Sequence, residues 1–378
     1  MTIYLDHAAT SPVRREVLEA MWPFLTTEPA NPSSRHTPGL RAQRALAAAV
    51  EEIAAVLGCR PGEVILTSGG TEADNLAVKG ISLARPRGRH VVTTAVEHPA
   101  VLESCRSLER SGFAITRVPV DRDGIVDPAA ATAAIREDTT LVSVQLANNE
   151  VGSVQPVADI AAAAARHRVP VHTDAVQAVG WLPVDLGELG VDAISVAGHK
   201  IGALRGTGVL AVRSRVPLEP LLHGGGQQRG RRSGTEDVAG AVGLATALRL
   251  AERDRSKAAE VAARRDRFVR EVVAGVDGAQ LTGSASRRLP NNASFCFRGV
   301  SGESLLVELD RRGIAVSSGS ACAAGSDEPS PVLTAMGYEP ELAGAALRVS
   351  IGVHTTEAEL AAAAEALREA ARAVRTLA

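Results

Sequence analysis

Short apolar segments alternate with amphipathic helical segments between Val64 and Val212. Each apolar segment has the length of a strand and ends in polar or glycine-rich residues, and the segment after it has helical periodicity. This alternation is typical of a mostly parallel sheet that helices cover on both faces. The strand-like segments include EVILT, HVVTT, AITRVPV, TLVSVQLA, VPVHTDA and DAISVAG.

The rest of the chain predicts longer helices and a smaller α+β unit. Leu40–Gly58 has helical periodicity and ends at a glycine, and Ala245–Val276 predicts one long helix that leads away from the sheet. Strands follow near ASFCFRG and IAVSSGSAC, and helices near SGESLLVELDRR and in the alanine-rich C-terminus. We therefore expect a large domain at residues 16–254 and a small domain formed by residues 1–15 and 255–378.

Composition and charge narrow the classes of partner. The 378 residues carry a net charge of -2 at pH 7, and 2% of them are aromatic. A nearly neutral chain has no general attraction for nucleic acid or anionic membranes, and few aromatics disfavour a base-stacking surface. The sequence contains no long apolar run and no basic leader, so we expect a cytoplasmic protein with no membrane partner.

Four cysteines occur, with no CxxC pair and no metal-ligand spacing to histidines. We expect reduced thiols and no metal site. Three of them, Cys59, Cys105 and Cys296, have the setting of structural residues. Cys322 lies in SSGSACAAGSDEPSP, which is small, polar and rich in glycine and proline, as a loop that delivers a thiol requires.

Two strand ends offer the pair of groups that pyridoxal phosphate requires. Asp174 ends VPVHTD, and Lys200 follows the next apolar segment between Gly198 and Gly202. Open α/β sheets place ligand sites at the carboxyl ends of their strands. An aspartate keeps the pyridinium nitrogen of this cofactor protonated, and a lysine carries its aldehyde. Taken alone, such a lysine is in most cases an ordinary solvated loop lysine, so the prediction for Lys200 depends on the residues around it.

Other polar groups follow neighbouring strands. The glycine turn Ser68–Thr71, with Thr71 as the expected N-cap of a helix, has the amide groups to cradle a phosphate. His98 follows one strand, and Asn148 and Asn149 follow another. Each has an ordinary structural reading by itself, but their position at successive strand ends favours a site.

A series of motifs runs through the chain in a fixed order: LDHAAT at 5–10, NPSSRH at 31–36, TSGGTEADNLA at 67–77, EHPAVL at 97–102, NNEVG at 148–152, DAVQAVG at 174–180, GHK at 198–200, RRSGTED at 231–237 and SSGSAC at 317–322. In this order they resemble cysteine desulfurases of the IscS/NifS type, within the class V aminotransferase family of fold-type I pyridoxal-phosphate enzymes. The resemblance implies an α/β fold, with a mixed, mostly parallel seven-stranded sheet in the large domain and a smaller α+β domain.

The resemblance also implies a role for each matching residue. Lys200 would hold pyridoxal 5'-phosphate as a Schiff base, and Asp174 would pair with its ring nitrogen. His98 would stack on the ring and take part in proton transfer, while Gln177 would contact the phenolate oxygen. The phosphate would lie on Gly70, Thr71, His199 and, from the other subunit of a homodimer, Thr235. Arg348 would bind the substrate carboxylate, with Asn149 beside it and beside the cofactor.

The implied reaction converts L-cysteine to L-alanine and keeps the sulfur as a persulfide on Cys322. Lys200 would take the α-proton, and the Cys322 thiolate would attack the substrate sulfur. The sulfur would then pass to an acceptor protein, for iron-sulfur cluster assembly, tRNA thiolation or DNA phosphorothioation. Nothing in the sequence selects among these acceptors.

Three alternative functions remain open at this point: a selenocysteine lyase, another class V activity without sulfur transfer, and a non-catalytic sulfur-relay scaffold. Two departures from the family pattern also bear on cofactor binding. Ala197 stands where many members have a serine or threonine that reaches the phosphate, and IGALRGTG after Lys200 lacks the usual Gly-Pro. Both changes would weaken cofactor binding without altering the chemistry.

Overall fold

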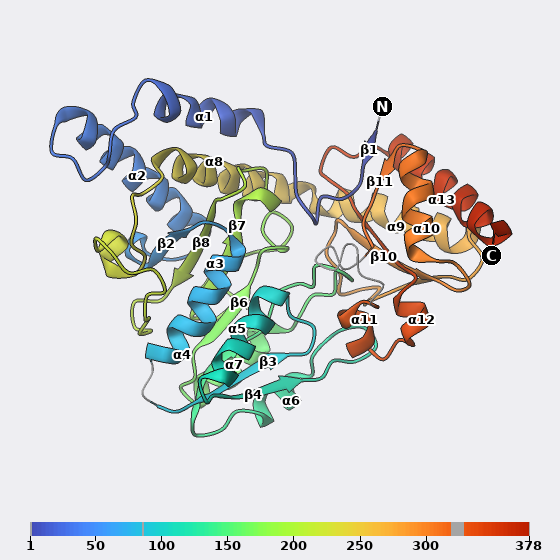
Figure 1. Ribbon diagram of the computed structural model, residues 1–378, viewed down its shortest axis with the longest axis horizontal. Helices are drawn as coiled ribbons and strands as arrows, with labels where there is room; N and C mark the ends of the chain where they lie inside the picture. The colour runs from blue at the N-terminus through green and yellow to red at the C-terminus, as the bar shows by residue number, and fades with distance from the viewer. Residues whose placement is uncertain (1, 85–86, 319–328, 378) are drawn as a thin grey trace.

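The computed structural model describes residues 2–84, 87–318 and 329–377, and a seven-stranded sheet organises its larger part (Figure 1). The strand order is β2-β8-β7-β6-β5-β3-β4. β8 is antiparallel to both of its neighbours and the other pairs are parallel, which confirms the expected mixed sheet. The strands are β2 (Val64–Thr67), β3 (His90–Thr94), β4 (Ala114–Val118), β5 (Thr139–Ser143), β6 (Val171–Asp174), β7 (Ala193–Ala197) and β8 (Gly208–Val212).

Both faces of this sheet are buried. In β7, Ile194 and Val196 pack into one core, and Ala193 packs into another on the opposite face. Because both faces are covered, the strands appear in the sequence as continuous apolar runs. The first core also contains residues of α1 (Arg15–Thr26), α2 (Thr37–Val56), α7 (Val157–Arg166) and α8 (Val238–Asp254). The second contains residues of α3 (Gly70–Asn75), its continuation Leu76–Gly80, α4 (Ile81–Ala84) and α5 (Pro99–Arg110), while α6 (Pro128–Ala133) contributes to the first.

A separate hydrophobic core holds the smaller part of the molecule together. It combines Leu5 with residues from Val261 to Val374. Its antiparallel sheet has the order β12-β10-β9, and β1 pairs in parallel with β11. The elements are β1 (Ile3–Tyr4), α9 (Ala258–Gly275), β9 (Ala279–Leu281), β10 (Asn292–Phe297), α10 (Gly302–Arg311), β11 (Ile314–Ala315), α11 (Pro331–Ala335), α12 (Pro340–Ala343), β12 (Ala346–Ser350) and α13 (Glu357–Leu377). The domain boundaries after residues 15 and 254 stay a prediction.

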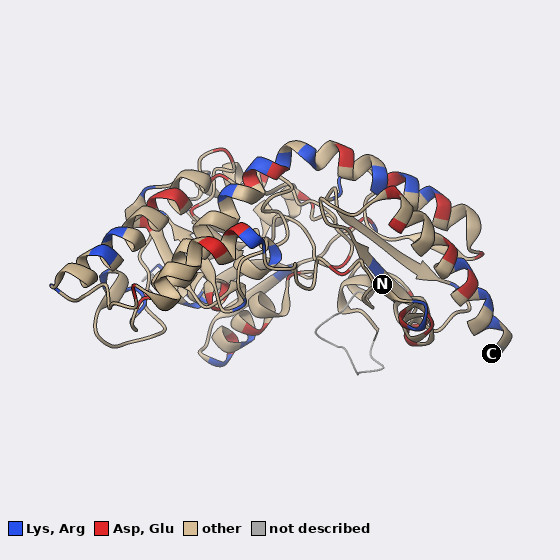
Figure 2. Cartoon of the chain, turned by 90° about the horizontal axis from the view of Figure 1, so that it is seen from above, with Lys and Arg blue, Asp and Glu red and all other residues tan. Residues whose placement is uncertain are grey.

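The single helix expected at 245–276 is wrong. Two helices, α8 and α9, are separated by one 3-10 turn at Arg255–Lys257. Asp254, the last residue of α8, is 3% exposed and accepts hydrogen bonds from Arg14 (2.6 Å) and Lys257 (3.2 Å). These tertiary contacts fix the end of α8, and helical periodicity alone does not reveal them. Figure 2 shows basic and acidic residues interspersed along the outer helices.

The expected N-cap at Thr71 is also wrong. The helix begins at Gly70, so that Thr71 lies inside its first turn. Glu72 accepts hydrogen bonds from the backbone N–H (2.7 Å) and the hydroxyl (2.6 Å) of Ser68, which closes the helix start earlier than the capping pattern predicts. Within the described ranges, no helix combines the length and the apolar composition that crossing a membrane requires.

Candidate active site

The carboxyl ends of β6 and β7 bring two of the predicted residues to one edge of the sheet. The two strands are parallel neighbours, and Asp174 is paired with Ser195 in their register. Asp174 ends β6, and Lys200 ends the single turn Gly198–Lys200 that follows β7. This edge is where open α/β sheets bind their ligands.

The charges of Asp174 and His98 each change the pKa of the other group. Burial raises the pKa of Asp174, and the charges of His98 and Lys200 together with a hydrogen bond from the Val176 N–H (2.9 Å) oppose that rise. Burial lowers the pKa of His98, which Asp174 opposes and Lys200 reinforces. His98 also caps α5, because its Nδ1 accepts from the Ala100 N–H at 3.1 Å. That acceptor role places the ring proton of the neutral imidazole on Nε2.

A buried polar network that the sequence reading missed lies behind Asp174. The His172 imidazole lies 2.9 Å from the hydroxyls of both Ser143 and Ser195, and burial lowers its pKa to about 3. Asp74 Oδ1 is 3.7 Å from His172 Nε2. Burial raises the pKa of Asp74, and the nearby charge of Asp174 raises it further. The sequence signal for this network was His172, a polar residue within the apolar segment that forms β6.

Glu97 is a third buried carboxyl in this region. Its oxygens accept from the Thr94 hydroxyl (2.7 Å) and the Gln145 N–H (3.0 Å), and burial raises its pKa to about 8. Burial therefore favours the uncharged form of Glu97 and of Asp74 relative to an exposed carboxyl. Of these three carboxyls, Asp174 is the one whose charged form is supported by the nearby charges of His98 and Lys200.

The N-terminal segment contacts Lys200 and Gln177 directly. The Lys200 ammonium donates to the carbonyls of Ala8 (2.5 Å) and Ala9 (2.8 Å), and Gln177 Nε2 donates to Ala8 O at 3.0 Å. The next residue along, Thr10, lies with its hydroxyl 3.3 Å from Nδ1 of His199. Burial lowers the pKa of His199 to about 4, so this imidazole is neutral at pH 7.

Arg348 joins the site from the smaller part of the molecule. It lies on β12 and is 1% exposed, with Nη1 donating to Asn149 O at 3.0 Å and Nη2 donating to Asp6 Oδ1 at 2.9 Å. The contact with Asp6 was not foreseen. Ser317 exchanges backbone hydrogen bonds with Arg348 (3.2 and 2.7 Å). The chain towards residues 319–328 therefore leaves from beside this arginine, and Cys322 lies outside the described residues.

The glycine turn before α3 is packed tightly against the sheet on one side and open on the other. A Cβ at Gly70 would lie 2.9 Å from Val176 and 3.3 Å from Cβ of Ala197, whereas a Cβ at Gly69, whose φ is +151°, would meet nothing within 4 Å. The first turn of a helix also leaves backbone N–H groups without helical partners. Open space beside such groups fits an anion.

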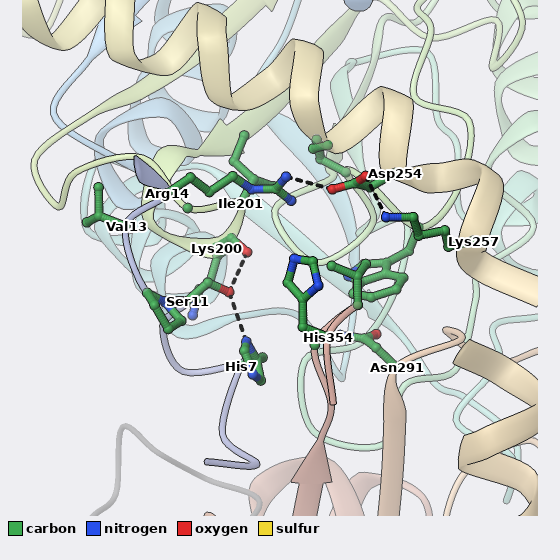
Figure 3. A pocket seen from close by; sticks show the side chains of 18 of the residues that line it. His7, Ser11, Val13, Arg14, Lys200, Ile201, Asp254, Lys257, Asn291 and His354 are labelled. Carbon is green, nitrogen blue, oxygen red and sulfur yellow. Dashed lines mark hydrogen bonds and ion pairs between the residues drawn. The ribbon is translucent and has the colours of Figure 1, made fainter. Parts of the chain in front are cut away.

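Thr235 lies on the rim of a second small cavity of about 80 Å³, which Ser68 and Thr207 also line. The role of Thr235 in binding the cofactor phosphate of the other subunit stays a prediction. A larger cavity of about 450 Å³ adjoins Lys200 and Gln177, between the N-terminal segment, the end of α8 and the loop after β12 (Figure 3). Its volume is in the range of small-molecule sites.

Three cysteines are unsuited to nucleophilic chemistry. Burial raises the pKa of Cys59 to about 11 and those of Cys105 and Cys296 to about 12. Their thiols are therefore protonated at pH 7, and the thiolate is the reactive form. Over the described ranges, no group of three or more His, Cys, Asp or Glu side chains is arranged to hold a metal ion.

Comparison with known proteins decides the family. The family profile described as Aminotransferase class-V matches residues 3–362. The chain belongs to the class-V aminotransferase family. Its relatives include the cysteine desulfurase IscS of Dictyoglomus turgidum, which is 45% identical over 377 residues, with 99% of this chain and 96% of the relative covered.

Solved structures agree with that assignment. A NifS-like protein matches with a TM-score of 0.91 and 37% identity, covering 98% of this chain and 99% of its own. A structure of SspA in complex with cysteine matches with a TM-score of 0.82 and 33% identity, covering 94% and 100%. These similarities place this family member among the cysteine desulfurases and do not favour the alternative functions.

Proposed function

We propose that the enzyme converts L-cysteine to L-alanine and holds the sulfur as a persulfide on Cys322. The observation that carries this proposal is that Asp174 and Lys200 lie at neighbouring strand ends and that Arg348 binds Asp6, in the N-terminal segment that also binds Lys200. The chain towards Cys322 leaves from beside Arg348. The test is to supply L-cysteine to the protein with pyridoxal phosphate and to measure alanine and sulfide. Absence of alanine would remove the proposal.

The residues present fit pyridoxal phosphate. The open glycine turn at Gly70 and Thr71 would hold the phosphate, and His199 and, from the other subunit, Thr235 would add further contacts. Asp174, whose charged form is supported by His98 and Lys200, would suit a pyridinium nitrogen, and Gln177 would suit the phenolate oxygen. When bound, this cofactor supplies an electron sink for the substrate's α-carbon.

Lys200 acts as the base that takes the α-proton. The C–H bond breaks, the proton moves to Nζ, and the electron pair stays on the substrate carbon. The carbonyls of Ala8 and Ala9 accept hydrogen bonds from the resulting ammonium and so stabilise it. His98, whose Nδ1 accepts from the Ala100 N–H, would stack on the cofactor ring and take part in proton transfer, as the resemblance implies.

Arg348 orients the substrate through its carboxylate. A planar guanidinium binds a carboxylate through two hydrogen bonds and so fixes its direction, and Asn149 lies against the same group. The Cys322 thiolate then attacks the substrate sulfur. A sulfur–sulfur bond forms, the carbon–sulfur bond breaks, and its electron pair passes to the carbon that is protonated to give alanine.

Ala197 gives a direct test of the phosphate site. Its Cβ adjoins Gly70, so Ala197→Ser would place a hydroxyl beside the glycine turn. A hydrogen bond to a charged group contributes about 1.5–3 kcal/mol. We therefore expect the Kd for pyridoxal phosphate, measured by equilibrium dialysis, to fall by about tenfold or more. Ala197→Cys is the control of similar size, and equal affinity in all three proteins would contradict the phosphate placement.

We propose that the enzyme is a homodimer, and that α1 contributes to the interface. Leu18, Trp22 and Leu25 are 49%, 65% and 56% exposed at helical spacing, which makes an apolar stripe on the surface of α1. We propose that a second copy of this chain covers the apolar stripe on α1. The predicted role of Thr235 in the other subunit's site also requires a second copy. The cytoplasmic location and the acceptor protein stay predictions from the sequence.

The substitution Trp22→Asp should weaken this dimer. A buried tryptophan at an interface centre commonly contributes about 2 kcal/mol or more, so we expect the dimer Kd to rise by at least about 30-fold. Sedimentation over a dilution series would measure it. Val307→Asp, at an apolar residue 47% exposed on α10, is the control. The same Kd in both variants would contradict the interface.

A further inference from the structure

A short N-terminal segment, residues 6–14, is bonded to the turn that carries Lys200. We call this segment the strap. The backbone N–H of Ser11 donates to His199 O at 2.8 Å, and the Ser11 hydroxyl donates to Lys200 O at 2.9 Å. Figure 3 shows Ser11 between His7 and Lys200, with its hydroxyl 3.4 Å from Nδ1 of His7. The strap therefore fixes the backbone on which the lysine stands.

Arg14, at the end of the strap, contacts the residues that follow Lys200. Its backbone N–H donates to Gly202 O at 3.0 Å. Its side chain lies so close to Gly202 that a Cβ there would be 2.7 Å from Arg14 Cγ, and the φ of Gly202, +85°, suits glycine. The turn from Gly198 to Gly202 thus lies against the strap through both backbone and side chains.

The strap also holds the reactive end of the lysine. Ala8 O and Ala9 O, which are both backbone atoms, accept hydrogen bonds from the Lys200 ammonium, as described above. Backbone acceptors have no side-chain freedom, so the position of Nζ follows the position of the strap. The lysine is held by the same nine-residue segment at its carbonyl and at its amine.

Each end of the strap carries an ion pair to a distant element. At one end Asp6 binds Arg348 on β12, with side chains 20% and 1% exposed. At the other, Arg14 binds Asp254 at the end of α8, with side chains 22% and 4% exposed. Lys257 binds the second oxygen of Asp254. Figure 3 shows Arg14, Asp254 and Lys257 in a row along one wall of the large cavity.

We propose that the strap is the positioning element of Lys200, and that the Arg14–Asp254 pair is the latch that keeps it in place. Arg14, Asp254 and Ser11 are then positioning residues for proton abstraction, because they act through Lys200. The inference rests on the proposed function, because it assumes that Lys200 is the base. Breaking the latch at Arg14 removes one end of the strap and misplaces Nζ, while the Asp6–Arg348 pair at the other end stays in place.

The test compares latch variants in the cofactor-loaded, full-length enzyme. Arg14→Gln and Asp254→Asn break the ion pair, and Arg14→Lys keeps the charge. Ser11→Ala removes the hydroxyl bond to Lys200 O, and Ser11→Thr keeps it. Arg249→Gln, which breaks the exposed Arg249–Glu52 pair (2.5 Å) on the same helix α8, is the matched control. For each variant we would measure kcat, KM, the unfolding midpoint and the isotope effect on kcat with α-deuterated cysteine.

We expect kcat to fall about tenfold in Arg14→Gln, Asp254→Asn and Ser11→Ala, with KM unchanged, since small misplacements of a reacting group are costly. The isotope effect should rise, because proton abstraction becomes slower than the other steps. Arg14→Lys and Ser11→Thr should recover most of kcat, and Arg249→Gln should match the native enzyme.

Two results would overturn the inference. In the first, the variants lower only the unfolding midpoint and leave kcat and the isotope effect unchanged, which is a structural role. In the second, Arg249→Gln has the same effect as Arg14→Gln. Ser11→Ala removes only one partly buried hydroxyl, so we expect this variant to fold. It therefore tests the inference even if the latch variants do not fold. Borohydride fixation of the cofactor on Lys200 of the native enzyme is checked first, and its failure would reject the proposed function instead.

Discussion

Replacing Lys200 by alanine should reduce alanine formation from L-cysteine by about 10⁴-fold, the upper range for loss of a general base. Neither the proton transfer nor the covalent attachment of the cofactor can be made by a methyl group. Alanine production, measured with saturating pyridoxal phosphate, gives the rate. Borohydride reduction followed by peptide mass spectrometry gives the attachment site.

The small number of lysines in the chain makes the attachment site easy to identify. The sequence contains three lysines, Lys79, Lys200 and Lys257. Lys79→Ala is the control, since Lys79 lies in the helix after α3 and outside both cavities. We expect the native protein and this control to carry the reduced cofactor on Lys200 alone. Attachment to Lys257, or undiminished turnover in Lys200→Ala, would contradict the proposed mechanism.

The second large effect is expected for Cys322→Ala. Sulfide and alanine should both fall by about 10³-fold or more, because the carbon–sulfur bond breaks only when a nucleophile takes the sulfur. The absorbance of the lysine-bound cofactor should stay unchanged, since Cys322 has no role in binding it. Sulfide and alanine are measured after incubation with L-cysteine, and the spectrum is recorded on the same sample.

The remaining thiols provide the control for this result. Cys59 is half-buried and its pKa is raised to about 11, so Cys59→Ala should leave both products unchanged. Alkylation of the persulfide in the native protein should label the peptide that contains Cys322. Label on another cysteine, or alanine formation that persists in Cys322→Ala, would move the nucleophile elsewhere and favour a class-V activity without sulfur transfer.

Strand ends were the most accurate part of the sequence reading. Asp174 and Lys200 were expected on adjacent strand ends, and the parallel register of β6 and β7 places them there. This success has a physical cause, because a strand buried on both faces leaves an apolar run whose end is marked by its first polar residue. The same logic failed for Thr71 and for the helix expected at 245–276, where side-chain contacts set the ends.

Contacts between residues far apart in the sequence could not be predicted from local sequence patterns. Asp6 binds Arg348 across 342 positions of sequence, and Arg14 binds Asp254 across 240. The buried carboxyls Asp74 and Glu97 carry no periodic signal that separates them from surface acids. Their pKa values are raised only because folding removes them from water.

The sequence by itself determined the alternation of strands and helices between Val64 and Val212, the residues at the strand ends and the family, because each depends on local patterns of a few consecutive residues. Only the tertiary structure decided how the lysine is held. The strap, its two ion pairs and the buried carboxyls with raised pKa values behind Asp174 depend on packing between elements. The pKa of a buried group depends on everything that surrounds it.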